Sequence, residues 1–214
     1  MARSGDMSRK GLRQGGIRAQ IAAAAARIMA EDGVDDFAQA KRKAARQLGI
    51  DERLALPRND EIETQLRAYR SLYQADEHPA QIAGLRRAAL AAMRALERFH
   101  PYLIGPVLKG IAGPYAGIDL QLFPENPKEV ELFLLDRRIA YATHEVRRYS
   151  GDRAREIAVL SLDWQDAPLR LAVFDHRDER LALKTSPAGR VSERAGIAEV
   201  GAMVAAAEDD TAQT

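Results

Sequence analysis

The sequence predicts an α+β fold, in which a helical module of about four helices is followed by a mixed sheet flanked by helices. Two observations predict it. Residues 17–99 contain long segments whose apolar residues recur at helical spacing. Beyond residue 100, short apolar runs alternate with glycine, proline and aspartate, which is the pattern of strands and turns. A chain of 214 residues can bury such a core without a disulfide or a structural metal.

Four segments of the N-terminal half are expected to be helices. They are the alanine-rich segment 17–31, then 37–49, 61–74 and a fourth segment that follows Pro79. Asp35 or Asp36 is expected to cap the second helix, and Asn59 or Asp60 the third, because short polar side chains accept hydrogen bonds from the first turn. The apolar stripes of these helices are expected to form a core.

The C-terminal half is expected to be a strand–helix–strand–strand–strand unit with a closing helix. Its predicted elements are a short helix or strand at 102–108, a strand at 117–123, a helix at 127–138, strands at 139–149, 155–164 and 168–175, and a helix at 194–208. In the strand at 117–123, Ile118, Leu120 and Leu122 share one face and Asp119 and Gln121 the other, because side chains alternate along a strand.

Composition narrows the classes of protein. The chain has no cysteine, which excludes a disulfide framework, a thiolate metal site and a cysteine nucleophile. Its 32 lysines and arginines nearly balance 31 acidic residues, so no overall field favours nucleic acid. No apolar run reaches membrane-spanning length, and the N-terminus lacks the apolar segment of a secretory signal. We therefore expect a cytoplasmic bacterial protein without a membrane partner.

The segment 108–122, LKGIAGPYAGIDLQL, carries the main functional pattern. It resembles the signature of the polymerase-beta-like nucleotidyltransferase superfamily, in which an apolar element ends in Gly-Ser, a loop follows, and a strand bears Asp-x-Asp. The resemblance implies that Lys109 and Gly110 approach the phosphates of a nucleotide. It also implies that Asp119 is the catalytic candidate and the metal ligand, with Gln121 beside it and Mg²⁺ as the cofactor of an active enzyme.

The same segment departs from that signature. Ile111 stands where the family has a small hydroxyl residue, and either Gly117 or Gln121 stands in place of the second carboxylate. A third carboxylate comes from a later strand in the family, but strand 168–175 offers Arg170 there. The resemblance thus implies a degenerate, noncatalytic protein that binds a nucleotide, an RNA or a protein partner. An active metal-dependent nucleotidyltransferase is the alternative, in which Asp163 or Asp175 could approach Asp119 and supply part of the missing charge.

The chain also resembles a group of proteobacterial proteins over residues 17–175. The residues that carry this second resemblance are RIMAEDGVDDFAQAKRKAARQLG at 27–49, LPRNDEIE at 56–63 and YLIGPVLKGIAG at 102–113. It implies a layout and no activity. Composition and the change of pattern near residue 100 predict a mobile basic tail at 1–16, a helical module at 17–99, an α/β domain at 100–207, which the first resemblance implies to be nucleotidyltransferase-like, and a polar tail at 208–214.

Two features of the helical half suggest other partners. The predicted second helix carries Lys41, Arg42, Lys43 and Arg46, which are candidate contacts for RNA or simply a solvated face. A helix-turn-helix reading is disfavoured, because Pro57 shortens the segment that would enter the major groove. The alanine-rich segment 17–31 could instead present small side chains to a protein partner or to a second copy of the chain, forming a homodimer.

Overall fold

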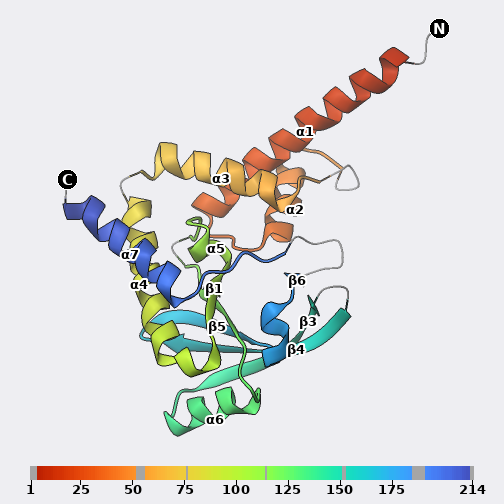
Figure 1. The fold of residues 1–214 in the computed structure, drawn as a ribbon. Coiled ribbons are helices and arrows are strands. Elements are labelled where there is room, and N and C mark those ends of the chain that lie inside the picture. The colour runs from red at the N-terminus through yellow and green to blue at the C-terminus, as the bar shows by residue number, and fades with distance from the viewer. Residues whose placement is uncertain are drawn as a thin grey trace. The chain divides into compact units, whose positions relative to one another are not determined.

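The structure, a computed structural model, describes residues 4–51, 56–75, 77–113, 115–150, 153–184 and 191–212. It confirms the α+β class: four helices come first, and a curled sheet of six strands with flanking helices follows (Figure 1). The chain forms two compact units. The helical unit contains residues 1–79 and 111–115, and the sheet unit contains residues 80–110 and 116–214.

The helical unit is built from α1 (Ser4–Glu31), α2 (Phe37–Gln47) and α3 (Asn59–Tyr73). Helix α1 begins earlier than the expected residue 17, so the predicted tail at 1–16 overlaps its first turns, and the mobility of that tail stays a prediction. The core combines alanines with larger apolar side chains; its fully covered members include Ala25, Ala40, Ala44, Ile21, Ile62 and Leu66. Small side chains let helices approach closely. The alanine-rich face therefore packs inside its own unit.

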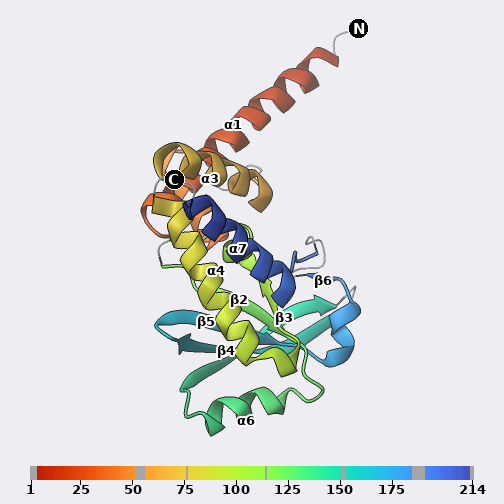
Figure 2. The same cartoon turned by 60° about the vertical axis from the view of Figure 1, so that its left-hand side comes forward.

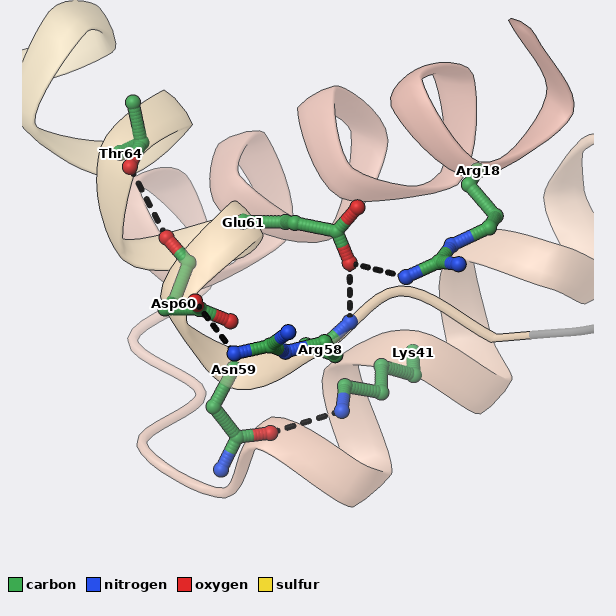
Figure 3. A network of polar contacts seen from close by, with 7 residues as sticks. All are labelled: Arg18, Lys41, Arg58, Asn59, Asp60, Glu61 and Thr64. Carbon is green, nitrogen blue, oxygen red and sulfur yellow. Dashed lines mark hydrogen bonds and ion pairs between the residues drawn. The ribbon is translucent and has the colours of Figure 1, made fainter. Parts of the chain in front are cut away.

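The helices of this unit are capped by short-range hydrogen bonds. The Asp36 carboxylate accepts from the backbone N–H of Gln39 at 2.8 Å and caps α2, one of the two expected alternatives. Neither expected cap of α3 is used. Glu61 instead reaches back to accept from the backbone N–H of Arg58 at 2.6 Å and also from the Arg18 guanidinium at 2.7 Å (Figure 3). A glutamate three residues into a helix can satisfy the N–H group that precedes it.

A buried arginine holds segment 111–113 within the helical unit. Arg70 is only 4% exposed, and its Nη1 donates to the carbonyl of Ala112 at 2.6 Å and lies 2.8 Å from Nε2 of His78. Burial first, and then the positive charge of Arg70, lower the pKa of His78. Burial lowers the pKa of the Arg70 guanidinium, and the negative charge of Asp35 opposes that change. This arginine is thus enclosed by groups of its own unit.

The sheet unit begins within α4 (Glu77–Ala95), which belongs to it from Ala80 on. The elements that follow are η1 (Glu97–Phe99), β1 (Tyr102–Ile104), α5 (Gly105–Leu108), β2 (Ile118–Leu122), α6 (Lys128–Asp136), β3 (Tyr141–Ser150), β4 (Arg153–Trp164), β5 (Ala167–Val173), η2 (His176–Arg180), β6 (Leu183–Lys184) and α7 (Ile197–Ala212). The predicted helices and strands are confirmed, and η1, η2 and β6 were not predicted. Segment 102–108 is a strand followed by a helical turn.

The strand order is β1-β2-β5-β4-β3-β6. Strand β2 is antiparallel to β1 and parallel to β5, and the other neighbours are antiparallel. The core face carries fully covered apolar side chains, among them Ile118, Leu120, Leu122, Leu169 and Leu171. Figure 2 shows α4 across the sheet with α7 beside it. The opposite face of β2 and β5 carries the polar side chains, as the alternation predicted.

The compact units and the predicted domains have different limits. The expected boundary falls between residues 99 and 100, whereas α4 packs with the sheet and segment 111–115 packs with the helices. The domain limits expected from the sequence stay a prediction. Among the described residues, the helices do not include one that combines the length and apolar character needed to cross a membrane.

Candidate functional site

An ion pair lies at the centre of the polar face of the sheet. Asp119 of β2 is directly opposite Arg170 of the parallel strand β5. The arginine Nε donates to Oδ1 at 2.6 Å and its Nη2 donates to Oδ2 at 2.8 Å. This two-pronged geometry matches the planar guanidinium to both carboxylate oxygens. The Asp119 side chain is 20% exposed and the Arg170 side chain is 48% exposed, so the pair faces open space above the sheet.

That open space is a cavity of about 340 Å³ over the polar face. Polar side chains from four strands, β2, β3, β5 and β6, contribute to its lining: Asp119, Gln121, His144, Arg148, Arg170 and Lys184. Apolar side chains, including Val146, Val159 and Phe174, form much of the remaining wall. With histidine counted as neutral, three cationic groups face one carboxylate, so the lining is electropositive. Such a concave, partly apolar surface with convergent polar groups is typical of a small-ligand site.

Curling of the sheet brings Arg148 to this cavity. Arg148 lies on β3, which is separated from β2 by two strands, yet both strands contribute to one lining. Desolvation lowers the pKa of the Arg148 guanidinium, and the Asp119 carboxylate opposes that change. Both side chains line the same cavity, where opposite charges attract one another. Arg148 is therefore part of the charged surface around Asp119.

Gln121 supplies the buried polar group of the cavity. It lies two residues after Asp119 on the same face of β2, is only 3% exposed, and lines the cavity. Its Oε1 accepts no hydrogen bond within the described part of the chain. A buried polar atom without a partner costs roughly 1–3 kcal/mol. The Gln121 amide therefore has unused hydrogen-bonding capacity next to the space that a ligand would fill.

The glycine that lies against Asp119 is Gly105. It follows β1 directly, has φ of +73°, and a Cβ added to it would come within 2.9 Å of Asp119 Oδ2. Gly110 also has a positive φ, but the group next to it is the end of the Arg86 side chain, at 3.4 Å from an added Cβ. Lys109 ends α5, where its backbone N–H donates to the Gly105 carbonyl at 3.1 Å.

The other two candidate carboxylates lie elsewhere. Asp163 is near the end of β4, opposite Pro168, and Asp175 caps η2 by accepting from the backbone N–H of Arg177 at 3.0 Å. Neither is among the residues that line the cavity. The cavity that contains the Asp119–Arg170 ion pair is therefore lined by neither Asp163 nor Asp175.

The residues present do not fit a magnesium ion. Mg²⁺ requires several oxygen ligands in near-octahedral geometry. Both oxygens of Asp119 accept hydrogen bonds from the guanidinium of Arg170, a fixed positive charge that repels a cation. In the part of the chain that the structure describes, no group of three histidine, aspartate or glutamate side chains could hold a metal ion.

The four candidate RNA contacts on α2 are largely engaged within the helical unit. The Lys41 ammonium donates to Asn59 Oδ1 at 2.7 Å (Figure 3), and Lys43 pairs with Asp32 at 2.8 Å. Arg46 Nε donates to the carbonyl of Arg42 at 3.4 Å. Arg42 is exposed. Binding of RNA by this helix stays a prediction.

Sequence reasoning missed Arg148, Lys184 and Gly105. Arg148 could have been found from the alternation of β3, which places it on the same face as His144 and Val146. Lys184 lies on a strand of two residues, too short to leave a pattern in sequence. Gly105 directly follows an apolar run of three residues, which was expected to be either helix or strand.

Comparisons of the chain with protein-family models, with curated protein sequences and with solved structures find no match in any of the three.

Proposed function

We propose that the sheet unit is a noncatalytic domain of the nucleotidyltransferase type that binds a nucleotide in the cavity over its polar face. The observation that carries the proposal is Arg170. In the family that the sequence resembles, a later strand brings a carboxylate to the metal site. Here the strand parallel to β2 brings a guanidinium directly opposite Asp119 instead.

The connectivity of the unit supports the comparison with that family. A strand, β1, runs into a short helix, α5, and the strand that carries Asp119 follows. Gly105, at the end of β1, suits the position of the family glycine better than Gly110 does, because its backbone lies against Asp119. Pro106 then occupies the place of the hydroxyl residue, and it offers neither a hydroxyl nor an N–H to a phosphate.

The lining favours a phosphate-bearing ligand. Arg148, Arg170 and Lys184 surround the cavity, and guanidinium and ammonium groups are the usual partners of phosphate oxygens. Apolar walls beside these cations suit a ligand with one charged end and one flat, less polar end. A nucleotide has both. Because positive side chains supply the counter-charge, binding needs no metal.

Calorimetric titration tests this proposal. We expect ATP, GTP, CTP or UTP, or the corresponding monophosphates, to release or absorb heat in EDTA. Added Mg²⁺ is expected to leave the affinity unchanged or to weaken it by competing for phosphate. Absence of binding by every one of these nucleotides would reject the proposed function. Binding that requires Mg²⁺ and leads to nucleotide transfer would establish the active-enzyme alternative instead.

The substitution Asp119→Asn separates the two alternatives by the sign of its effect. If Asp119 is a countercharge within an anion site, removing its charge should strengthen nucleotide binding in EDTA several-fold. If Asp119 is a metal ligand, the same change should weaken Mg²⁺-dependent binding. Asp163→Asn is the matched control, because that exposed carboxylate lies outside the cavity lining, and we expect less than a twofold effect from it.

A further inference from the structure

The charge and size of the cavity specify its ligand more closely than "a nucleotide". This inference rests on the proposed function, that the cavity binds nucleotides at all. Three cationic side chains and one carboxylate leave two positive charges in excess, with histidine counted as neutral. A phosphate monoester carries close to two negative charges at neutral pH. A triphosphate carries more, and without a metal ion its additional charge would remain uncompensated.

Size supports the same choice. Ligand cavities occupy about 300–1,000 Å³, so a cavity of about 340 Å³ lies at the lower end of that range. It suits one base, one sugar and one phosphate better than a triphosphate chain or a stretch of RNA. The positive charges also belong to one concave face, rather than to a long groove that would follow a polymer backbone.

The positions of the charges indicate where the phosphate would lie. Arg170 is anchored on Asp119, and Arg148 feels the same carboxylate from across the cavity. The Lys184 ammonium has no ion-pair partner within the described residues. A phosphate between Arg148, Arg170 and Lys184 would accept hydrogen bonds from these cations and take over part of the pairing that Asp119 provides to Arg170. Charge-assisted hydrogen bonds of this kind are roughly twice as strong as neutral ones.

Gln121 provides an independent sign of a ligand. Its side chain is 97% buried, and its amide oxygen lacks a hydrogen-bond partner in the described chain. Rotation of the amide by half a turn exchanges its oxygen and nitrogen, so the group can either accept from or donate to a ligand. A buried amide without a hydrogen-bond partner lowers the stability of the folded protein, and a hydrogen bond to a ligand would remove that cost.

We infer that the cavity binds a nucleoside monophosphate without a metal ion, with Arg148, Arg170 and Lys184 on the phosphate and Gln121 hydrogen-bonded to the uncharged part of the ligand. Gln121 is then a residue that determines specificity. Arg148 and Lys184 determine the preference for a monophosphate over an uncharged nucleoside.

The experiment compares AMP, GMP, CMP and UMP with the corresponding nucleosides and triphosphates, by calorimetry of the full chain in EDTA. We expect at least one monophosphate to bind at least tenfold more tightly than its nucleoside and its triphosphate. Arg148→Ala and Lys184→Ala should each weaken that binding by about tenfold, which corresponds to loss of one charge-assisted contact. Arg147→Ala is the matched control, because Arg147 is exposed on the adjacent position of β3, and less than a twofold effect is expected.

Gln121→Leu adds a readout that a purely structural role would not give. The substitution should weaken monophosphate binding by about tenfold, yet keep or raise the midpoint of thermal unfolding, because it removes an unsatisfied buried amide. Tighter binding of a triphosphate or of a single-stranded RNA, or unchanged binding by Gln121→Leu, would overturn the inference while leaving nucleotide binding intact. Failure of all the nucleotides to bind would reject the proposed function itself.

Discussion

Three cations of the helical unit and the cations that line the cavity of the sheet unit have different surroundings. In the helical unit, Arg18 and Lys43 pair with carboxylates, and Arg70 is enclosed by a carbonyl and an imidazole. In the sheet unit, Arg148 and Lys184 face a cavity whose one carboxylate already binds an arginine. The first arrangement gives each cation a polar partner within its own unit, whereas the second leaves an excess of positive charge beside open space.

The surroundings of a cation determine whether its removal changes the free energy of unfolding or the affinity for a ligand. Removing a buried and satisfied cation leaves its partners without hydrogen bonds, so the cost appears in the free energy of unfolding. Removing a cation from a cavity lined by other cations relieves repulsion in the empty protein, so the cost appears in ligand affinity. The comparison therefore predicts which substitutions destabilise the protein and which weaken binding.

The largest expected effect is that of Arg70→Ala. The change leaves the Ala112 carbonyl without its 2.6 Å donor and opens a void in a buried position. We expect a loss of about 3 kcal/mol in the free energy of unfolding, which urea denaturation would measure.

Arg67→Ala is the control for this prediction. Arg67 lies one turn earlier on α3 and is exposed, so its removal should change stability by less than about 0.5 kcal/mol. Equal effects of the two substitutions would break the comparison, because the buried cation of the helical unit would then have no special structural role.

An intermediate effect is expected at the glycine beside the ion pair. Gly105→Ala combines a positive φ with a collision against Asp119, whereas Gly110→Ala has a similar φ and meets only the flexible end of Arg86. We expect losses of about 2 and about 1 kcal/mol, respectively, in urea denaturation. The Gly105 substitution should also alter nucleotide affinity by moving the carboxylate. If both variants bind nucleotide as the wild type does, Gly105 has no role in positioning Asp119.

The resemblance to the nucleotidyltransferase family implied that Arg170 stands where that family has a third carboxylate. Alternation of residues 118–122 was sufficient to predict that Asp119 and Gln121 share one face of their strand, because strand periodicity depends only on local geometry. It could not predict that Asp119 and Arg170 are in register, since the pairing of β2 with β5 joins segments about 50 residues apart.

The sequence also could not predict that the sheet curls. It therefore could not predict that Arg148 lines the same cavity as Asp119. The caps were predicted in part, because Asp36 caps α2 as one of the expected residues whereas the cap of α3 differs. Glu61 replaced the expected Asn59 or Asp60 because a longer side chain could reach the preceding N–H group.

The smallest expected effect concerns Glu61 and depends on pH. The backbone N–H of Arg58, and next the Arg18 guanidinium, hold the pKa of this carboxyl below its ordinary value of 4.5. A lowered pKa in the folded state means that the stabilisation is complete above pH 4.5 and is lost as the pH falls through the folded-state pKa. Because the side chain is 40% exposed, solvent screening limits the effect of Glu61→Gln to about 0.5 kcal/mol at pH 7.

Urea denaturation of the wild type and of Glu61→Gln between pH 7 and pH 3 would measure this contribution. The difference between the two proteins should shrink as acid protonates Glu61, since the charged carboxylate is what the two donors stabilise. Glu193→Gln, at an exposed position, is the control and should show no such convergence. A difference that stays constant across this range would mean that Glu61 acts through its shape as a capping residue. The paired charges of the helical unit would then contribute less to the free energy of unfolding than their contrast with the cavity cations predicts.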